Sequence, residues 1–207
     1  MGYKLLLLTA FIACLFLFSF RADKKKKIVF FGDSITQAAV KKGGFIDLMQ
    51  TSIQQKGMDQ NYELIGAGVS GNKIYDLYLR IENDVLAKKP DVVFVYIGVN
   101  DVWHKATSGS GTDFDKFGKF YDAVVKKIQN QGAKVILVTP AAIGEKHDYS
   151  NTQDGDLNSY SNWIRQYAAT NTLGLVDLRK IFHEYSLANN PNNVAKGILT
   201  TDGVHLN

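Results

Sequence analysis

The 207-residue sequence contains a single cysteine, Cys14, and only 3 prolines. One cysteine cannot form an intrachain disulfide or a thiolate metal cluster, which excludes the disulfide-rich class of small domains. If an N-terminal leader is removed, no cysteine nucleophile remains either. Hydrophobic residues make up 45% of the chain and charged residues 21%. This composition is typical of one globular domain and excludes disordered, collagen-like and coiled-coil proteins.

Most of the chain also lacks an excess of one charge sign. The whole sequence has a formal net charge of +4 and a pI near 9.0, which would suit a nucleic-acid or membrane partner. However, six of the 24 basic residues precede Ile28, against one of the 20 acidic residues, which leaves 18 basic and 19 acidic residues in the body. The basicity therefore belongs to the N-terminus, and we expect no nucleic-acid partner.

Long hydrophobic runs are absent except at the N-terminus, where residues 5–20 are apolar apart from Thr9 and Ser19. After the short basic start, this pattern predicts a signal peptide over residues 1–22 and an exported protein. A membrane anchor is the alternative, although 16 residues fall short of the roughly 20 that a bilayer core requires. A lysine-rich linker, residues 23–27, follows and offers transient membrane contact through the N-terminus.

Residues 11–14, Phe-Ile-Ala-Cys, resemble a lipoprotein acylation box ending at Cys14. A lipid-anchored form is therefore a further alternative. The six residues after this cysteine are still apolar apart from Ser19, so we interpret Cys14 as part of the hydrophobic segment.

Short apolar runs alternate with segments of helical period from residue 27 onward. The predicted strands cover residues 27–31, 62–65, 91–97, 134–138 and 173–176. The predicted helices carry apolar stripes over residues 45–53, 74–85, 114–128, 157–167 and 178–187. Five strands separated by helices predict one α/β domain over residues 28–207, with a five-stranded parallel sheet covered on both faces. Ligands of such sheets bind beyond the carboxyl ends of the strands.

Polar groups suited to ester hydrolysis stand at those strand ends. Ser34 follows the first strand, the glycine-rich segment 66–72 follows the second, and Asn100 follows the third in an expected turn. Asp202 and His205 stand near the end, at a three-residue interval that lets both side chains point to the same side of one turn. Ester hydrolysis requires an oxygen nucleophile, a base, a group that orients the base, and donors for the oxyanion.

Each of these residues also has a purely structural interpretation. Ser34 could cap a helix through a capping box with Gln37, and Asp202-Gly203 could form an ordinary turn. His205 could be a surface histidine, and Asn100 could be an ordinary polar residue of a loop. Because all of them fall at the expected edge of one sheet, their joint appearance favours the catalytic interpretation.

A nucleotide site is a competing hypothesis, because residues 66–71 match the pattern G-x-G-x-x-G. That pattern normally follows the first strand of a dinucleotide-binding fold, with an acidic residue about 20 positions later at a strand end. Here it follows the second strand, and Asp91 begins the third strand instead of ending it. No Walker A loop, H-E-x-x-H or complete calcium loop occurs in the sequence. We therefore expect neither a metal nor an organic cofactor.

Four ordered blocks resemble the SGNH (GDSL) hydrolase family. They are Phe-Gly-Asp-Ser-Ile-Thr at 31–36, Val-Ser-Gly-Asn at 69–72, Gly-Val-Asn-Asp at 98–101 and Asp-Gly-Val-His at 202–205. The resemblance extends over residues 28–207. It implies a flavodoxin-like three-layer α/β/α fold and a serine-dependent carboxylic-ester hydrolase.

The same resemblance implies roles for individual residues. Ser34 corresponds to the family's nucleophile, and His205, held by Asp202, to its general base. The backbone N–H groups of Ser34 and Gly71 and the side-chain amide of Asn100 correspond to the oxyanion hole. Asp33, which precedes the nucleophile, is expected to shape the turn.

The resemblance implies a small-molecule or polysaccharide ester as substrate. O-acetyl groups on carbohydrate are one option, and the acyl chain of a lysophospholipid or an aryl ester is the other. No long apolar lid segment occurs in the sequence, which favours short acyl groups. Two non-enzymatic alternatives are a ligand-binding α/β module and a membrane-surface protein that uses the lysine-rich linker.

Members of the family normally continue past the D-x-x-H block into a last helix that packs on the sheet. This sequence ends two residues after His205. We expect from the resemblance that the 207-residue form is weakly active. Adding such a helix should then raise both the melting temperature and the turnover.

Overall fold

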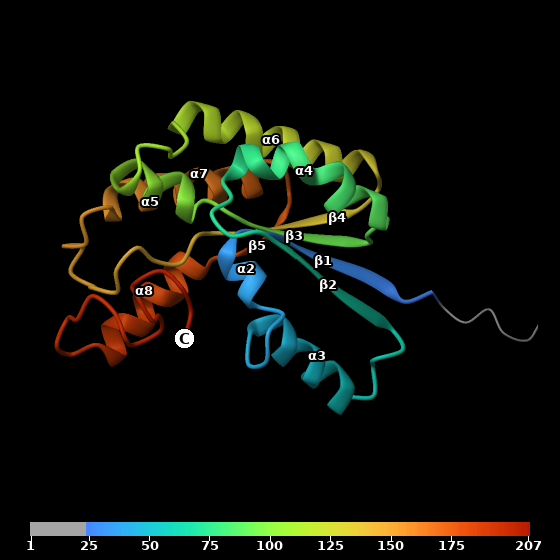
Figure 1. Ribbon diagram of the computed structural model, residues 1–207, viewed down its shortest axis with the longest axis horizontal. Coiled ribbons are helices and arrows are strands. Elements are labelled where there is room, and N and C mark those ends of the chain that lie inside the picture. Colours follow the sequence, from blue (N-terminus) through green and yellow to red (C-terminus); the bar gives the residue numbers. More distant parts are fainter. Residues whose placement is uncertain (1–23) are drawn as a thin grey trace, which may run out of the picture.

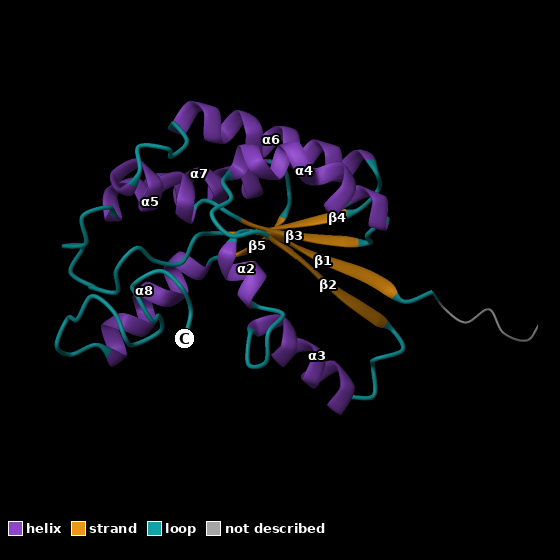
Figure 2. Cartoon of the chain, viewed as in Figure 1, coloured by secondary structure: helices purple, strands orange, loops and turns teal. Residues whose placement is uncertain are grey.

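The computed structural model describes residues 24–207, in which five parallel strands form one sheet (Figures 1 and 2). The predicted leader, residues 1–22, lies outside the described residues. Along the sheet the strands run in the order β2-β1-β3-β4-β5. Their bounds are β1 Lys26–Gly32, β2 Tyr62–Gly68, β3 Val92–Tyr96, β4 Lys134–Val138 and β5 Gly174–Val176. All five predicted strands are present.

Helices cover both faces of this sheet, so the predicted three-layer α/β/α architecture is confirmed. In Figure 1, α4, α6 and α7 lie above the sheet, while α2, α3 and α8 lie below it. The bounds are α2 Ser34–Ala38, α3 Phe45–Gln55, α4 Ile74–Asp84, η1 Leu86–Lys88, α5 Val99–Thr107, α6 Phe114–Asn130, α7 Asp154–Thr170 and α8 Leu178–Asn189. Among the described residues, no helix is long and apolar enough to cross a membrane.

The order of the strands determines where a ligand site can form. The chain passes from β1 to its neighbour β2 and then returns to β3 on the other side of β1. The connections after β1 and β3 therefore leave the sheet in different directions at its carboxyl edge, where doubly wound sheets form their ligand crevice. Ser34 directly follows β1, and Asn100 follows β3.

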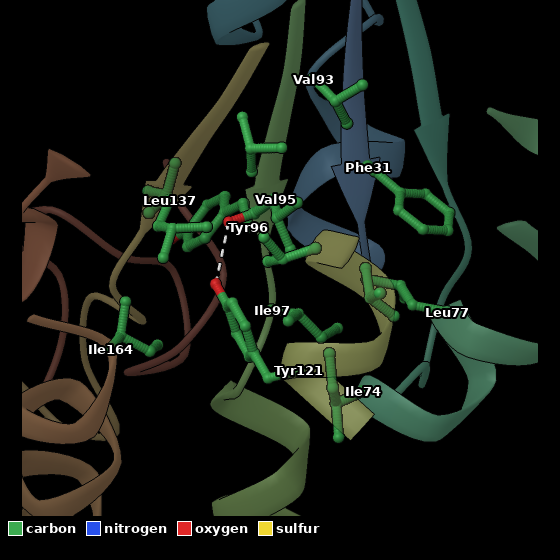
Figure 3. Packing of buried hydrophobic residues seen from close by; sticks show 14 of the residues in the cluster. Phe31, Ile74, Leu77, Val93, Val95, Tyr96, Ile97, Tyr121, Leu137 and Ile164 are labelled. Carbon is green, nitrogen blue, oxygen red and sulfur yellow. Dashed lines mark hydrogen bonds between the residues drawn. The ribbon is translucent and has the colours of Figure 1, made fainter. Parts of the chain in front are cut away.

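The main hydrophobic core fills the layer between the sheet and the helices above it (Figure 3). Phe31 on β1 and Val95 on β3 are fully buried there, as are Leu77 on α4 and Tyr121 on α6. A smaller cluster around Phe30 packs on the opposite face, where the Phe30 ring stacks on Phe94 with 4.9 Å between centroids. These two clusters anchor the central strands on both sides and so hold the carboxyl edge of the sheet in place.

Two glycines of the G-x-G-x-x-G pattern, Gly66 and Gly68, have a packing role on β2. A Cβ atom on Gly68 would lie 2.1 Å from the backbone nitrogen of Gln37, and one on Gly66 would lie 2.4 Å from a methyl carbon of Val40. Both contacts are far below a van der Waals separation. Glycine at these positions therefore lets α2 and the residues that follow it lie directly against β2.

Two helices differ from the prediction. Asn100 was expected in a turn, and no helix was predicted for the residues after Ser34, but the two residues lie in the first turns of α5 and α2. α2 has five residues and α5 has nine, so neither is long enough to carry an apolar stripe over several turns. Asp33 caps α2, because its carboxylate accepts a hydrogen bond from the backbone of Ile35 at 3.0 Å. The capping role considered for Ser34 is therefore wrong.

Candidate active site

Ser34 stands at the tight connection between β1 and α2. Gly32, the last residue of β1, makes this connection possible, because a Cβ atom there would lie 2.3 Å from both the Thr36 hydroxyl and the Tyr96 carbonyl oxygen. Asp33 is 2% exposed, whereas Ser34 is half-buried. The hydroxyl of Ser34 thus remains open to a ligand at the carboxyl edge of the sheet.

The hydroxyl of Ser34 forms a hydrogen-bonded relay with His205 and Asp202. Ser34 Oγ lies 2.9 Å from His205 Nε2, and His205 Nδ1 lies 2.7 Å from Asp202 Oδ2. The other carboxylate oxygen of Asp202 accepts hydrogen bonds from the backbone N–H groups of Val204 and His205. The structure therefore brings together three predicted residues from opposite ends of the domain.

The carboxylate of Asp202 is ionised in this arrangement. Partial burial raises its pKa, but the bonds from the His205 ring and from the backbone of His205 and Val204 outweigh that effect and lower the pKa to about 2. An ionised carboxylate beside Nδ1 favours the tautomer that carries its proton on that nitrogen, which turns an acceptor, Nε2, toward the Ser34 hydroxyl.

Asn100, in the first turn of α5, contacts the loop that contains Gly71. Gly71 has φ +77°, a left-handed conformation that favours glycine. Asn100 is 2% exposed, and its Nδ2 atom donates to the carbonyl of Asn72, the residue after Gly71, at 3.0 Å. One amide hydrogen of Asn100 thus holds the loop.

Comparison with known protein families identifies the family to which this chain belongs. Residues 30–207 match the model of the GDSL-like Lipase/Acylhydrolase family. The chain belongs to this family. The resemblance seen in the sequence is thereby confirmed.

Relatives with known names agree with the family. The crystal structure of an acetyl xylan esterase, AlAXEase, is 65% identical, with a TM-score of 0.87 over 87% of this chain and 91% of that chain. An acetylxylan esterase of Geobacillus stearothermophilus is 28% identical over 176 residues, 77% of this chain and 78% of the relative. An uncharacterized lipoprotein, YqeF, of Bacillus subtilis (strain 168) is 26% identical over 204 residues, 86% of this chain and 82% of the relative. The protein is a carboxylic-ester hydrolase.

Arg80 on α4 links the two backbone segments of this GDSL-type site, and the sequence analysis did not single it out. Its guanidinium donates to the carbonyl of Gly32 at 2.7 Å and to the side chain of Asn72 at 2.6 Å. It also lies over the ring of Phe31, 4.6 Å from the centroid. One side chain therefore holds the end of β1, next to Ser34, against the loop that contains Gly71.

Glu145 is a second residue that holds part of the site in place and that the sequence analysis did not single out. It is 3% exposed, and its carboxylate accepts hydrogen bonds from the backbone N–H groups of Ile198, Leu199 and Thr200 and from the Thr200 hydroxyl. Thr200 Oγ1 in turn accepts from the backbone of Gly203, inside the D-x-x-H block. Glu145 thus fixes the segment that delivers Asp202 and His205. Contacts of this kind have no sequence motif.

Replacing Glu145 with glutamine should destabilise the fold by about 2–4 kcal/mol, because an amide cannot accept all four bonds and places an N–H group against other donors. Denaturant unfolding of the variant measures this change. Glu63→Gln on the exposed edge of β2 removes the same charge and should cost less than about 0.5 kcal/mol. Equal losses in the two variants would show that the buried bonds are not responsible.

Asp33 makes the stability of the protein depend on pH. Burial is the largest cause that raises its pKa, the Ile35 N–H opposes it, and the nearby Asp101 charge raises it further, to about 7. In the unfolded chain the same carboxyl ionises near pH 3.8. Between these two values the folded state binds the extra proton, so this group's contribution to stability falls as the pH rises.

Asp33→Asn should therefore stabilise the protein at pH 8 by on the order of 2–4 kcal/mol, and should have little effect at pH 4. Thermal unfolding of both proteins across this pH range tests the expectation. Asp115→Asn, on the exposed surface of α6, serves as the control. If the stabilisation of Asp33→Asn relative to the wild type does not grow with pH, the raised pKa of Asp33 is contradicted.

Proposed function

We propose that this hydrolase is a serine acetylesterase that removes O-acetyl groups from a polysaccharide. The relay of Ser34, His205 and Asp202, with separations of 2.9 and 2.7 Å, carries the proposal. Two relatives are named as acetylxylan esterases, which supports an acetylated carbohydrate as the substrate class.

Each group of the relay has one role in the proposed reaction. Ser34 Oγ attacks the carbonyl carbon of the ester while His205 Nε2 accepts the hydroxyl proton. His205 then gives this proton to the alcohol oxygen as the ester C–O bond breaks, which leaves the acyl group on Ser34. A water molecule then gives a proton to the same nitrogen and attacks the acyl carbon. The bond from this carbon to Ser34 Oγ breaks, His205 returns the proton to Ser34 Oγ, and the carboxylic acid is released. Asp202 orients the imidazole and stabilises its protonated form.

The proposed oxyanion hole consists of the backbone N–H groups of Ser34 and Gly71 and the side-chain amide of Asn100. These donors would face the oxygen that becomes negative in the tetrahedral intermediate. Support comes from the left-handed turn at Gly71, the bond between Asn100 and the following loop residue, and the position of Ser34 in the first turn of α2.

Asn100→Ala should lower kcat by about 10²- to 10³-fold with little change in KM, because the lost donor acts mainly in the transition state. Steady-state hydrolysis of p-nitrophenyl acetate measures both constants. Asn130→Ala, at the exposed end of α6, is a matched control. A variant that loses affinity but keeps its turnover would remove Asn100 from the oxyanion hole.

Hydrolysis of longer acyl esters is a second candidate, and one feature of the structure favours it. A hollow of about 410 Å³ lies on the α2–α3 side of His205, with the apolar side chains of Ile35, Phe45, Leu48 and Leu206 in its lining. Such a surface could accept the acyl chain of a lysophospholipid or a larger aryl ester.

A series of p-nitrophenyl esters from acetate to palmitate, together with acetylated xylan, separates the two candidates. The proposed acetylesterase should show its highest kcat/KM on acetate and should release acetate from the polymer. A maximum at long chains, without release from the polymer, would replace it with the second candidate. Absence of turnover on every activated ester would instead support a non-catalytic binding module.

We also propose that the protein is exported and that its lysine-rich linker makes transient contact with membranes. The apolar segment 5–20 and the similarity to a lipoprotein support export. Lys24 to Lys26 are exposed at the start of the domain. Cell fractionation should find the protein outside the cytoplasm. Replacement of Lys24, Lys25 and Lys26 by glutamine, which leaves the backbone of β1 in place, should weaken binding to anionic vesicles and leave ester hydrolysis unchanged.

A further inference from the structure

A second hollow, of about 310 Å³, lies on the other side of the relay, and it differs in chemistry from the apolar one. It opens between the loop after β4, residues 143–153, and the segment 195–204 that leads to the D-x-x-H block. Trp103 and Asp202 both belong to its lining. Because Asp202 is bonded to His205 Nδ1, this hollow adjoins the relay.

Trp103 gives the hollow an aromatic wall. The side chain is half-buried, and its ring meets the ring of His205 edge to face, with 6.0 Å between centroids. A sugar ring has an apolar face of C–H groups and a polar rim. It therefore suits a pocket in which one aromatic wall is surrounded by polar groups.

The two amide side chains in the lining are already occupied within the protein. Asn151 bonds to the backbone of Lys146 on both its oxygen and its nitrogen, and it also donates to Asp154. Gln153 donates to the carbonyl of Val102 at 2.8 Å. These contacts fix the shape of the wall, so specificity must come from the remaining polar groups.

Lys146 and Lys196 are the two basic residues in the lining of the hollow. Neither forms an ion pair with any residue in the described part of the chain. One carboxylate also lines the hollow, that of Asp202, and it is bonded to His205 at 2.7 Å. The lining therefore holds two lysines and one carboxylate.

We propose that this hollow binds the sugar next to the acetylated one, and that Lys146 and Lys196 select a sugar that carries a carboxylate. The inference rests on the proposed acetylesterase function and names its substrate class more closely, as an acetylated acidic oligosaccharide. Lys146 is half-buried and Lys196 is exposed, so the hollow can hold the carboxylate at its rim without burying it.

The test compares two acetylated oligosaccharides of the same backbone, one neutral and one with a uronic-acid substituent. The wild-type enzyme should have the higher kcat/KM on the acidic substrate, mainly through a lower KM. The double variant K146Q/K196Q should lose this preference by about 3- to 10-fold, as expected for two partly exposed charge pairs. The preference should also shrink in about 0.5 M salt, because exposed charges are screened.

Two controls keep the interpretation specific. Lys119→Gln, at an exposed lysine of α6 that forms no ion pair with residues 24–207, should retain the preference. Hydrolysis of p-nitrophenyl acetate, which has no sugar, should change less than two-fold in the double variant. Equal acidic-to-neutral ratios in wild type and double variant would overturn the inference but leave the acetylesterase intact. Absence of hydrolysis of both oligosaccharides by the wild type would overturn both.

Discussion

Replacing Ser34 with alanine is expected to lower kcat for p-nitrophenyl acetate by about 10⁴- to 10⁶-fold. The variant keeps the β1–α2 connection, because Gly32 and Asp33 shape it through backbone contacts and the cap on Ile35. It loses the oxygen that would attack the ester, so the acyl-enzyme cannot form. The remaining donors could then only assist a direct attack by water.

Loss of turnover in Ser34→Ala identifies the nucleophile only if the variant remains folded. Ser34 Oγ has one hydrogen bond, to His205, so its removal should shift the melting temperature only slightly. Ser52→Ala on the exposed surface of α3 is a matched control and should keep full activity. A Ser34→Ala enzyme that retains more than about a tenth of the wild-type turnover would remove Ser34 from its proposed role.

His205→Ala should cause a loss of similar size, about 10⁴- to 10⁶-fold in kcat, because the Ser34 hydroxyl then lacks its proton acceptor. The double variant Ser34→Ala/His205→Ala should be no less active than either single variant, since the two groups act as one unit. Stopped assays with p-nitrophenyl acetate at high enzyme concentration measure these residual rates.

His183→Ala provides the comparison for a histidine outside the relay. His183 lies on α8 and bonds to Tyr149, so its loss should leave turnover within about two-fold of wild type. If the single losses at Ser34 and His205 multiply in the double variant, the residues act independently and the relay is not the catalytic unit.

The strands of the fold could be predicted because each is a short, nearly continuous apolar run. β1 and β3 are buried on both faces as central parallel strands are, so periodicity was not needed to recognise them. The helices α2 and α5 could not be predicted in the same way. They are too short for an apolar stripe over several turns, and polar residues such as Ser34 and Asn100 lie in their first turns.

The residues of the site also fall into two groups, those that the sequence predicted and those that it did not. Ser34, Asp202 and His205 stand in motifs, and the structure brings their side chains within hydrogen-bond distance. Arg80 and Glu145 contact mostly backbone groups from distant segments, and such contacts leave no pattern in the sequence. A lone glutamate in a loop is usually a solvated surface residue, so the buried position of Glu145 follows only from the tertiary structure.

The most direct test of the proposed serine nucleophile is covalent labelling with a fluorophosphonate, followed by mass spectrometry of the peptides. Loss of activity should parallel the appearance of one phosphonyl adduct on Ser34, and His205→Ala should greatly slow its formation. Complete inactivation with Ser34 unlabelled, or with the adduct on another residue, would contradict the account.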